Sequence, residues 1–232
     1  MKGRRSEWQA RLAPYLRFGV AAGALALAKR TVHRWVQWGS LVFFEQPLVT
    51  SSTDLERDVR IREVTERDLQ VLATSFRRDL GELRARLGRG DRGFCAFADG
   101  RNGTPLHMRW ATNAPTEIPE AGLWLCAGPH EVYVYDAVTH PLFRGRRLSG
   151  AVRIIMDNAL VDAGCTTKLA YVKGDNHSMH RSLAGAPVPF RELFQIRYIR
   201  RAGRPPLVIG RYRPPLYPAP EPALFAKATA LG

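Results

Sequence analysis

The chain has 232 residues, of which 45% are hydrophobic and 24% are charged. This length fits one large domain or one domain with extensions, and the composition excludes a collagen-like or wholly disordered chain. The 35 Lys and Arg residues against 21 Asp and Glu give a formal net charge of +14, which attracts phosphates, nucleic acid, anionic lipid or an acidic partner. Its three widely spaced cysteines exclude a disulfide framework and a CxxC metal site, so we expect a reducing, cytoplasmic location.

The N-terminal segment, residues 1–33, is predicted to be helical and contains an uncharged apolar stretch, Phe18–Ala28. Eleven helical residues extend about 16 Å, roughly half of a ~30 Å hydrocarbon core, so this stretch is too short to span a membrane. It also resembles a secretory signal, but Glu7, Pro14 and the Ala- and Gly-rich composition favour a helix packed on the domain. Basic residues on both sides leave a peripheral membrane contact open.

The next part of the chain alternates predicted strands and helices. Strands are predicted at 34–45, 59–64, 93–99, 104–110 and 131–138. An amphipathic helix that carries Leu69, Leu72 and Phe76 is predicted after the second strand, and a short helix is predicted at about 79–88. Thr65 is the expected N-cap of the first of these helices. Residues 111–129 are predicted to be a loop. The polar stretch before Val59 marks a boundary between an N-terminal extension, 1–58, and the main domain, 59–213.

A βαβ unit is predicted at 131–173, where a strand is followed by a basic turn, a helix at 147–163 and a parallel strand at 168–173. A short helix is expected at 176–184 and two strands at about 190–200 and 206–213. The tail, 214–232, is rich in Pro and is expected to be extended along the surface. This order predicts an α/β sheet with parallel and antiparallel pairs.

The basic turn has the sequence HPLFRGRRLSGA, residues 140–151, and places Arg144, Arg146 and Arg147 where a helix begins. A helix N-terminus binds anionic phosphate through free backbone N–H groups, and Gly145 lets a ligand approach the backbone closely. Residues 140–213 contain fourteen basic and four acidic residues, so most of the net charge lies near this turn. A solvated basic helix face is the alternative explanation.

Two segments, VYVYDAVTHPLFRGRRLSGAVRIIMDNAL and YVKGDNHSMHRSL, resemble the GNAT superfamily of N-acyltransferases. The resemblance covers about 59–213. It implies a GNAT-like mixed α/β fold, with a mostly antiparallel sheet and a central βαβ acyl-CoA unit flanked by helices. It also implies that acetyl-CoA, or another acyl-CoA, is the co-substrate. The residues expected to contact it are Val138, Thr139, Arg144, Gly145, Arg146, Arg147, Leu148, Ser149 and Asn176.

The chain departs from the family pattern at several positions. Arg147 and Ser149 stand where the pyrophosphate loop has Gly in its relatives, and Leu183 stands where many relatives have a Tyr that protonates the leaving thiolate. Ser182 lies beside Leu183. The general acid is therefore missing from its usual place.

Two side chains are candidates for the general base, Asp136 at the end of strand 131–138 and His107 on strand 104–110. Each has a structural alternative, because a strand-end carboxylate can satisfy loop amides and a lone His is often a core residue. The thioester carbonyl is expected to be polarised by a backbone N–H near Val138. His177 and His180 lack a third ligand of suitable spacing, so no metal is expected.

Three functions follow as hypotheses. The first is transfer of an acetyl group from acetyl-CoA to a primary amine of a small molecule or amino sugar. The second replaces CoA with an acyl carrier protein, because carrier proteins are acidic and the chain is basic. The third is a non-catalytic module that binds an anionic partner. We do not expect nucleic acid to be the partner, because no helix-turn-helix, zinc finger or RNA-recognition signature is present.

Overall fold

The computed structural model describes residues 36–53, 58–99, 103–184, 186, 188–210 and 214–218. The predicted helix over 1–33, with its apolar stretch, lies outside the described residues. Among the residues that are described, no helix is both long enough and apolar enough to cross a membrane.

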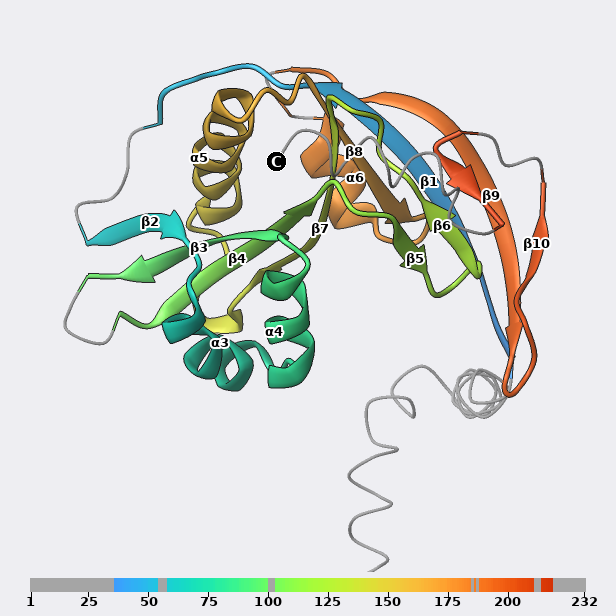
Figure 1. Cartoon of the computed structure of the whole chain (residues 1–232), viewed down its shortest axis with the longest axis horizontal. Helices are drawn as coiled ribbons and strands as arrows, with labels where there is room; N and C mark the ends of the chain where they lie inside the picture. The colour runs from blue at the N-terminus through green and yellow to red at the C-terminus, as the bar shows by residue number, and fades with distance from the viewer. Residues whose placement is uncertain are drawn as a thin grey trace, which may run out of the picture.

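An eight-stranded sheet forms the centre of the molecule (Figure 1). Its strands are β1 (Val36–Pro47), β2 (Val59–Glu63), β3 (Arg92–Ala98), β4 (Pro105–Thr112), β7 (Glu131–Thr139), β8 (Thr167–Lys173), β9 (Arg191–Arg201) and β10 (Leu207–Ile209). They lie in the order β10-β9-β1-β8-β7-β4-β3-β2. The β7–β8 pair is parallel and every other pair in this sheet is antiparallel. The predicted mixed, mostly antiparallel sheet is confirmed.

Helices cover both faces of the sheet. Helices α5 (Leu148–Asp162) and α6 (His177–Ala184) share one face, and α3 (Leu69–Phe76) and α4 (Leu80–Gly88) cover part of the other. Alternation along the strands explains this division. In β3, for example, Phe94 and Ala96 pack towards α5, whereas Cys95 and Phe97 pack towards α3 and α4.

The strand predicted at 34–45 is present as β1, and it lies between β8 and β9 rather than at an edge. Leu41 of β1 pairs with Lys173 of β8, and on its other side β1 pairs with β9. Phe43 and Phe44 are buried. A strand from the segment before Val59 therefore completes the central sheet.

A small second sheet corrects two predictions. It consists of β5 (Thr116–Ile118), β6 (Leu123–Leu125) and β11 (Leu216–Tyr217), in the order β11-β6-β5. Residues 111–129 are therefore not all loop, and the tail does not lie wholly on the surface, because Leu216 is 2% exposed. The cause is packing, since Leu123, Leu125 and Leu216 form one apolar cluster with the main sheet. Strands of two or three residues leave no periodic signal in a sequence.

Candidate active site

The parallel strands β7 and β8 separate after a short paired stretch. Glu131, Val132 and Tyr133 pair with the first three residues of β8, and no pair is formed beyond Tyr133 although both strands continue. A cavity of about 640 Å³ lies where the strands part. Its walls include β7 residues 133–137, β8 residues 170–173 and three α6-region residues, Asn176, Met179 and Leu183. The cavity therefore has side chains from both faces of the sheet.

Strand β7 is irregular at this cavity. Tyr135 pairs with Trp110 and Val138 pairs with Met108, so Arg109 of β4 lies opposite two residues, Asp136 and Ala137. Asp136 has φ 46°, in the left-handed region. This is a β-bulge, a feature that redirects backbone groups at the point where it occurs. The irregular backbone lies at Asp136 and Ala137, earlier than the expected position near Val138, which belongs to the regular ladder.

Asp136 is held by two arginines from the α3–α4 region. Arg78 donates from Nε and Nη2 at 3.1 and 2.5 Å, and Arg86 donates from Nη1 at 2.7 Å. Burial alone would raise the pKa of the Asp136 carboxyl, but these hydrogen bonds outweigh it and the pKa is lowered. A charged carboxylate that is held by two arginines is a poor proton acceptor. This environment therefore favours a structural role for Asp136 over a role as the general base.

His107 lies in the core and is 1% exposed. Its Nδ1 is 2.7 Å from Thr139 Oγ1, and it is not among the residues that line the cavity. Burial lowers the pKa of its imidazole to about 3. The ring is therefore neutral at physiological pH. For His107, too, a structural role in the core is favoured over a role as the general base.

On the α3–α4 side, the cavity is lined by tyrosines and by one carboxylate that sequence reasoning missed. Tyr133 stacks on Tyr135 and on Tyr171, with ring centroids 5.4 and 6.1 Å apart. Tyr171 Oη donates to Glu120 Oε2 at 3.3 Å, and Lys173 Nζ is 2.9 Å from Glu120 Oε1. The alternation of EVYVYDAV indicates that Tyr133 and Tyr135 share a face. Glu120 comes from the β5–β6 connection, where the sequence has no motif.

The basic turn leads from β7 into α5 through a 3-10 turn at Pro141–Phe143. Gly145 has φ 85° and Arg147 has φ 54°, so the backbone adopts the left-handed conformation twice in three residues, once with a non-Gly side chain. A Cβ at Gly145 would meet no atom within 4 Å. In the described part of the chain, Gly150 is the first residue of α5 whose amide donates to a backbone carbonyl, that of Arg147 at 3.0 Å. The amides of Leu148 and Ser149 belong to the first turn of the helix, where amides lack intrahelical acceptors, and such groups suit a pyrophosphate.

Comparison with solved structures gives matches to GNAT acetyltransferases. A putative GNAT-family acetyltransferase from Novosphingobium aromaticivorans has a TM-score of 0.50 at 14% identity, over 72% of this chain and 66% of its own. A GCN5-related glucosamine N-acetyltransferase region of a fungal multi-domain β-N-acetylglucosaminidase gives 0.51 at 13% identity, over 75% of this chain and 22% of its own. The chain has the GNAT fold.

A Drosophila protein of known structure is also similar, with a TM-score of 0.52 at 14% identity over 77% of this chain and 57% of its own. The chain thus spans less than two thirds of each of these three structures. No family model and no curated protein matches the sequence.

Three more residues expected to contact the acyl-CoA donor differ in whether they line the cavity. Asn176 caps α6, with Oδ1 accepting from the Met179 amide at 3.2 Å, and it also lines the cavity. Val138 and Thr139 do not line the cavity, since Val138 packs towards α3 and Thr139 holds His107. At the family's Tyr position Leu183 faces the cavity.

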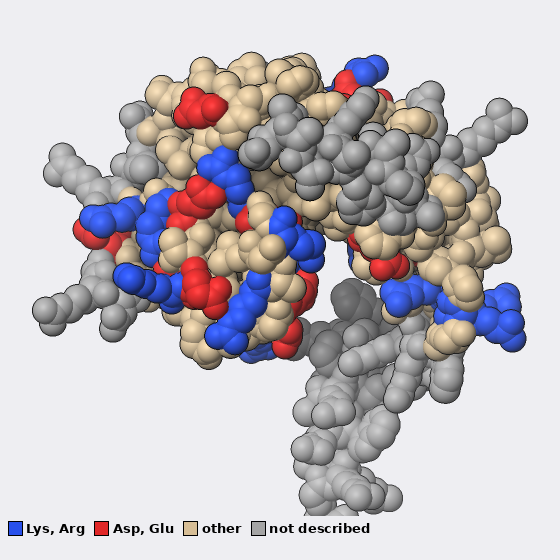
Figure 2. Space-filling view, in the orientation of Figure 1, with Lys and Arg blue, Asp and Glu red and all other residues tan. Residues whose placement is uncertain are grey.

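Charged side chains around the site are largely paired. Figure 2 shows Lys and Arg mixed with Asp and Glu over the region of α3 and α4, where Arg84 Nε lies 2.9 Å from Glu66 Oε1. Arg146 lies 3.4 Å from Asp58, whereas Arg144 and Arg147 are exposed at the basic turn. No group of three or more His, Cys, Asp or Glu residues in the described ranges could hold a metal ion.

Proposed function

We propose that this protein is an N-acyltransferase that transfers an acetyl group from acetyl-CoA, or the acyl group of another acyl-CoA, to a primary amine of a small molecule. The observation that supports this most directly is the cavity of about 640 Å³ at the separation of β7 and β8. It joins the α5–α6 face, which begins at the phosphate-type turn, to a face with tyrosines and Glu120. Two substrates can therefore meet from opposite sides of the sheet.

The donor would be held first by its phosphates. The Leu148 and Ser149 amides, the open backbone at Gly145 and the exposed guanidinium groups of Arg144 and Arg147 supply hydrogen bonds and positive charge. Arg147, at a position where the family pattern has Gly, adopts the left-handed conformation that Gly adopts readily. An Arg at this position is therefore compatible with a turn that Gly favours, and it adds a charge.

In the proposed reaction the amine nitrogen attacks the thioester carbonyl carbon, a C–N bond forms and the C–S bond breaks. Backbone N–H groups at the Asp136–Ala137 bulge would stabilise the oxyanion. Glu120 would accept the ammonium proton, directly or through water. Among the described residues its one cationic partner is Lys173, whose side chain is half-exposed, whereas Asp136 is held by two arginines. The thiolate can leave without protonation because thiols are comparatively acidic.

A carrier-protein donor is the second candidate, and one observation favours it. Leu142 is 82% exposed beside Arg144 in the basic turn. An exposed apolar side chain in a turn that also carries arginines suits an acidic carrier protein, because charge steers the encounter and the apolar contact stabilises the complex.

Titration calorimetry with acetyl-CoA and desulfo-CoA tests the proposal. The full-length chain should bind both ligands with micromolar affinity, and an Arg144→Ala, Arg147→Ala double variant should lose about tenfold or more. The matched control is Arg67→Ala, Arg84→Ala, which removes two exposed charges on the other face. Absence of binding to either ligand would overturn the acyl-CoA donor and favour the carrier protein or the non-catalytic module.

A further inference from the structure

One face of the central sheet ends in an exposed apolar row that crosses β1, β9 and β10. Trp38 of β1 pairs with Ile199 of β9, and Ile199 pairs with Leu207 of β10. Trp38 is 47% exposed, Leu207 is 60% exposed, and Ile209, which follows on the same face of β10, is 48% exposed. These three are half of the large apolar side chains that are exposed in the described part of the chain. Exposed apolar surface is therefore gathered on this row, a common mark of an interaction site.

Alternation along the strands places the row on the face of the sheet opposite the small sheet. The residues Leu41 of β1, Ile196 of β9 and Val208 of β10 pack in the apolar cluster that includes the small sheet. Each of them differs by an odd number of positions from the row residue of its own strand, so the row points to the other side. None of the hydrophobic clusters of the described residues includes Ile199 or Leu207.

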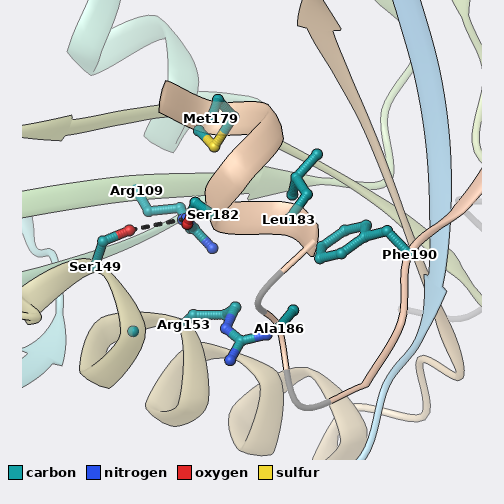
Figure 3. Close-up of a pocket in the computed structure, with 9 residues that line it drawn as sticks. Arg109, Ser149, Arg153, Met179, Ser182, Leu183, Ala186 and Phe190 are labelled. Carbon is teal, nitrogen blue, oxygen red and sulfur yellow. Dashed lines mark hydrogen bonds between the residues drawn. The ribbon is translucent and has the colours of Figure 1, made fainter. Parts of the chain in front are cut away.

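Helix α6 covers the far end of the same face. Its Met179 and Leu183, together with Phe190, pack against the cluster that contains Val42 of β1. Figure 3 shows these three side chains at a cavity of about 180 Å³ between α5 and α6, which shares them and Arg109 with the larger cavity. The row lies on the part of β1 that precedes Val42. It is therefore a surface apart from the proposed active site.

Arginines flank the row. Arg197 of β9 pairs with Ile209, Arg201 of β9 pairs with Val36, and Arg204 lies in the turn between β9 and β10. Residues 193–210 contain four arginines and no Asp or Glu, and all four are exposed and form no ion pair with a described residue. Figure 2 shows Lys and Arg without Asp or Glu at the end of this hairpin, at the lower right. The row thus lies in a positive field.

We propose that the apolar row and its flanking arginines dock this protein on an anionic lipid bilayer. Trp and aliphatic side chains would enter the boundary between headgroups and acyl chains, and the guanidinium groups would bind lipid phosphates. A second copy of the chain suits this face less well, because a symmetric contact would bring Arg197 and Arg201 against the same arginines of the partner. The docking does not depend on acyl transfer.

Cosedimentation of the full chain with lipid vesicles tests this docking. Vesicles with about one third phosphatidylglycerol should bind the chain about tenfold or more tightly than vesicles of phosphatidylcholine alone, and salt should weaken the binding. Leu207→Thr, Ile209→Thr removes apolar surface and keeps residues that favour a strand, so it should bind anionic vesicles about tenfold more weakly. The matched control is Val49→Thr, Val71→Thr, which changes two exposed apolar residues elsewhere and should bind as the parent chain does.

A charge variant tests the arginines separately. Arg197→Gln, Arg201→Gln should reduce affinity for anionic vesicles about tenfold and make the remaining binding less sensitive to salt. Its control, Arg67→Gln, Arg84→Gln, removes two exposed charges near α3 and α4 and should change the affinity by less than about twofold. The charge variant changes β9 and the apolar variant changes β10, so loss of folding in one, seen by circular dichroism, leaves the other as a test.

Four outcomes would overturn the docking. The first is no binding of the parent chain to anionic vesicles. The second is equal binding by the parent chain and both variants, which would assign the membrane contact to another segment, such as Phe18–Ala28. The third is a loss in the charge variant alone, which would indicate a purely ionic contact with an acidic partner. The fourth is a parent chain that dimerises in solution while the apolar variant stays monomeric, which would assign the face to a second copy.

Discussion

Arg86 Nη1 lies 2.7 Å from Asp136 Oδ2, and both side chains are largely buried. This contact ties α4 to the bulge of β7, where Asp136 has φ 46°. The bulge thus has a charged support on the side opposite α5. The sequence suggests the carboxylate as a candidate base, whereas its surroundings favour an anchor for the backbone.

We expect Asp136→Asn to destabilise the fold by about 3–5 kcal/mol, because it removes the buried carboxylate from Arg86, whose side chain is 7% exposed, and leaves that charge only the more exposed carboxylate of Glu82. Urea denaturation followed by circular dichroism measures this loss. Glu82→Gln, which removes the more exposed partner of Arg86, is the control and should cost much less. A difference below about 1 kcal/mol between the two variants would show that Asp136 does not anchor the bulge.

His107 should give stability a pH dependence. Its folded pKa of about 3 lies below the unfolded value near 6.5, so the unfolded state binds more protons between these values and stability falls as pH falls. From pH 7.5 to pH 5 the expected loss is about 2 kcal/mol. Comparison of urea curves for the parent chain and His107→Gln checks this, because the variant should lack that part of the slope. Equal slopes in both proteins would contradict a buried neutral histidine.

The Lys168–Asp157 pair should behave as a coupled unit. Lys168→Met alone should lower the free energy of unfolding by about 3–5 kcal/mol, because it leaves the buried carboxylate of Asp157 without its cation. Asp157→Leu alone should lower it by a similar amount, because it leaves the buried ammonium of Lys168 without its anion. The double variant should be more stable than either single variant. A double-mutant cycle of urea midpoints measures the coupling, and strictly additive losses would contradict it.

Glu120→Gln tests the proton acceptor of the proposed reaction. We expect kcat/KM to fall about 100-fold or more, with acetyl-CoA affinity unchanged, because the amide cannot accept the ammonium proton. Glu117→Gln, an exposed neighbour on β5, should retain full activity. Unchanged turnover in the Glu120 variant would assign proton removal to another group or to solvent.

Much of the fold could be predicted because the strands and helices around the βαβ unit have clear periodicity. The phosphate-type turn was visible as Gly145 among arginines. Glu120 could not be found, because its place in the cavity depends on the small sheet, which brings Leu216 of the tail against β6. The role of Arg109 was equally hidden, since only its position opposite the bulge makes an ordinary strand residue a junction between two cavities.

The most direct test of the account is turnover itself, measured by mass spectrometry of purified protein with acyl-CoA donors and a panel of primary amines. The account predicts an acylated amine in equal amount to the CoA released, with strongly reduced formation of both by Glu120→Gln. Release of CoA without an acylated amine, or binding of CoA with no turnover of any amine, would contradict an N-acyltransferase and favour a GNAT-fold module that binds an anion.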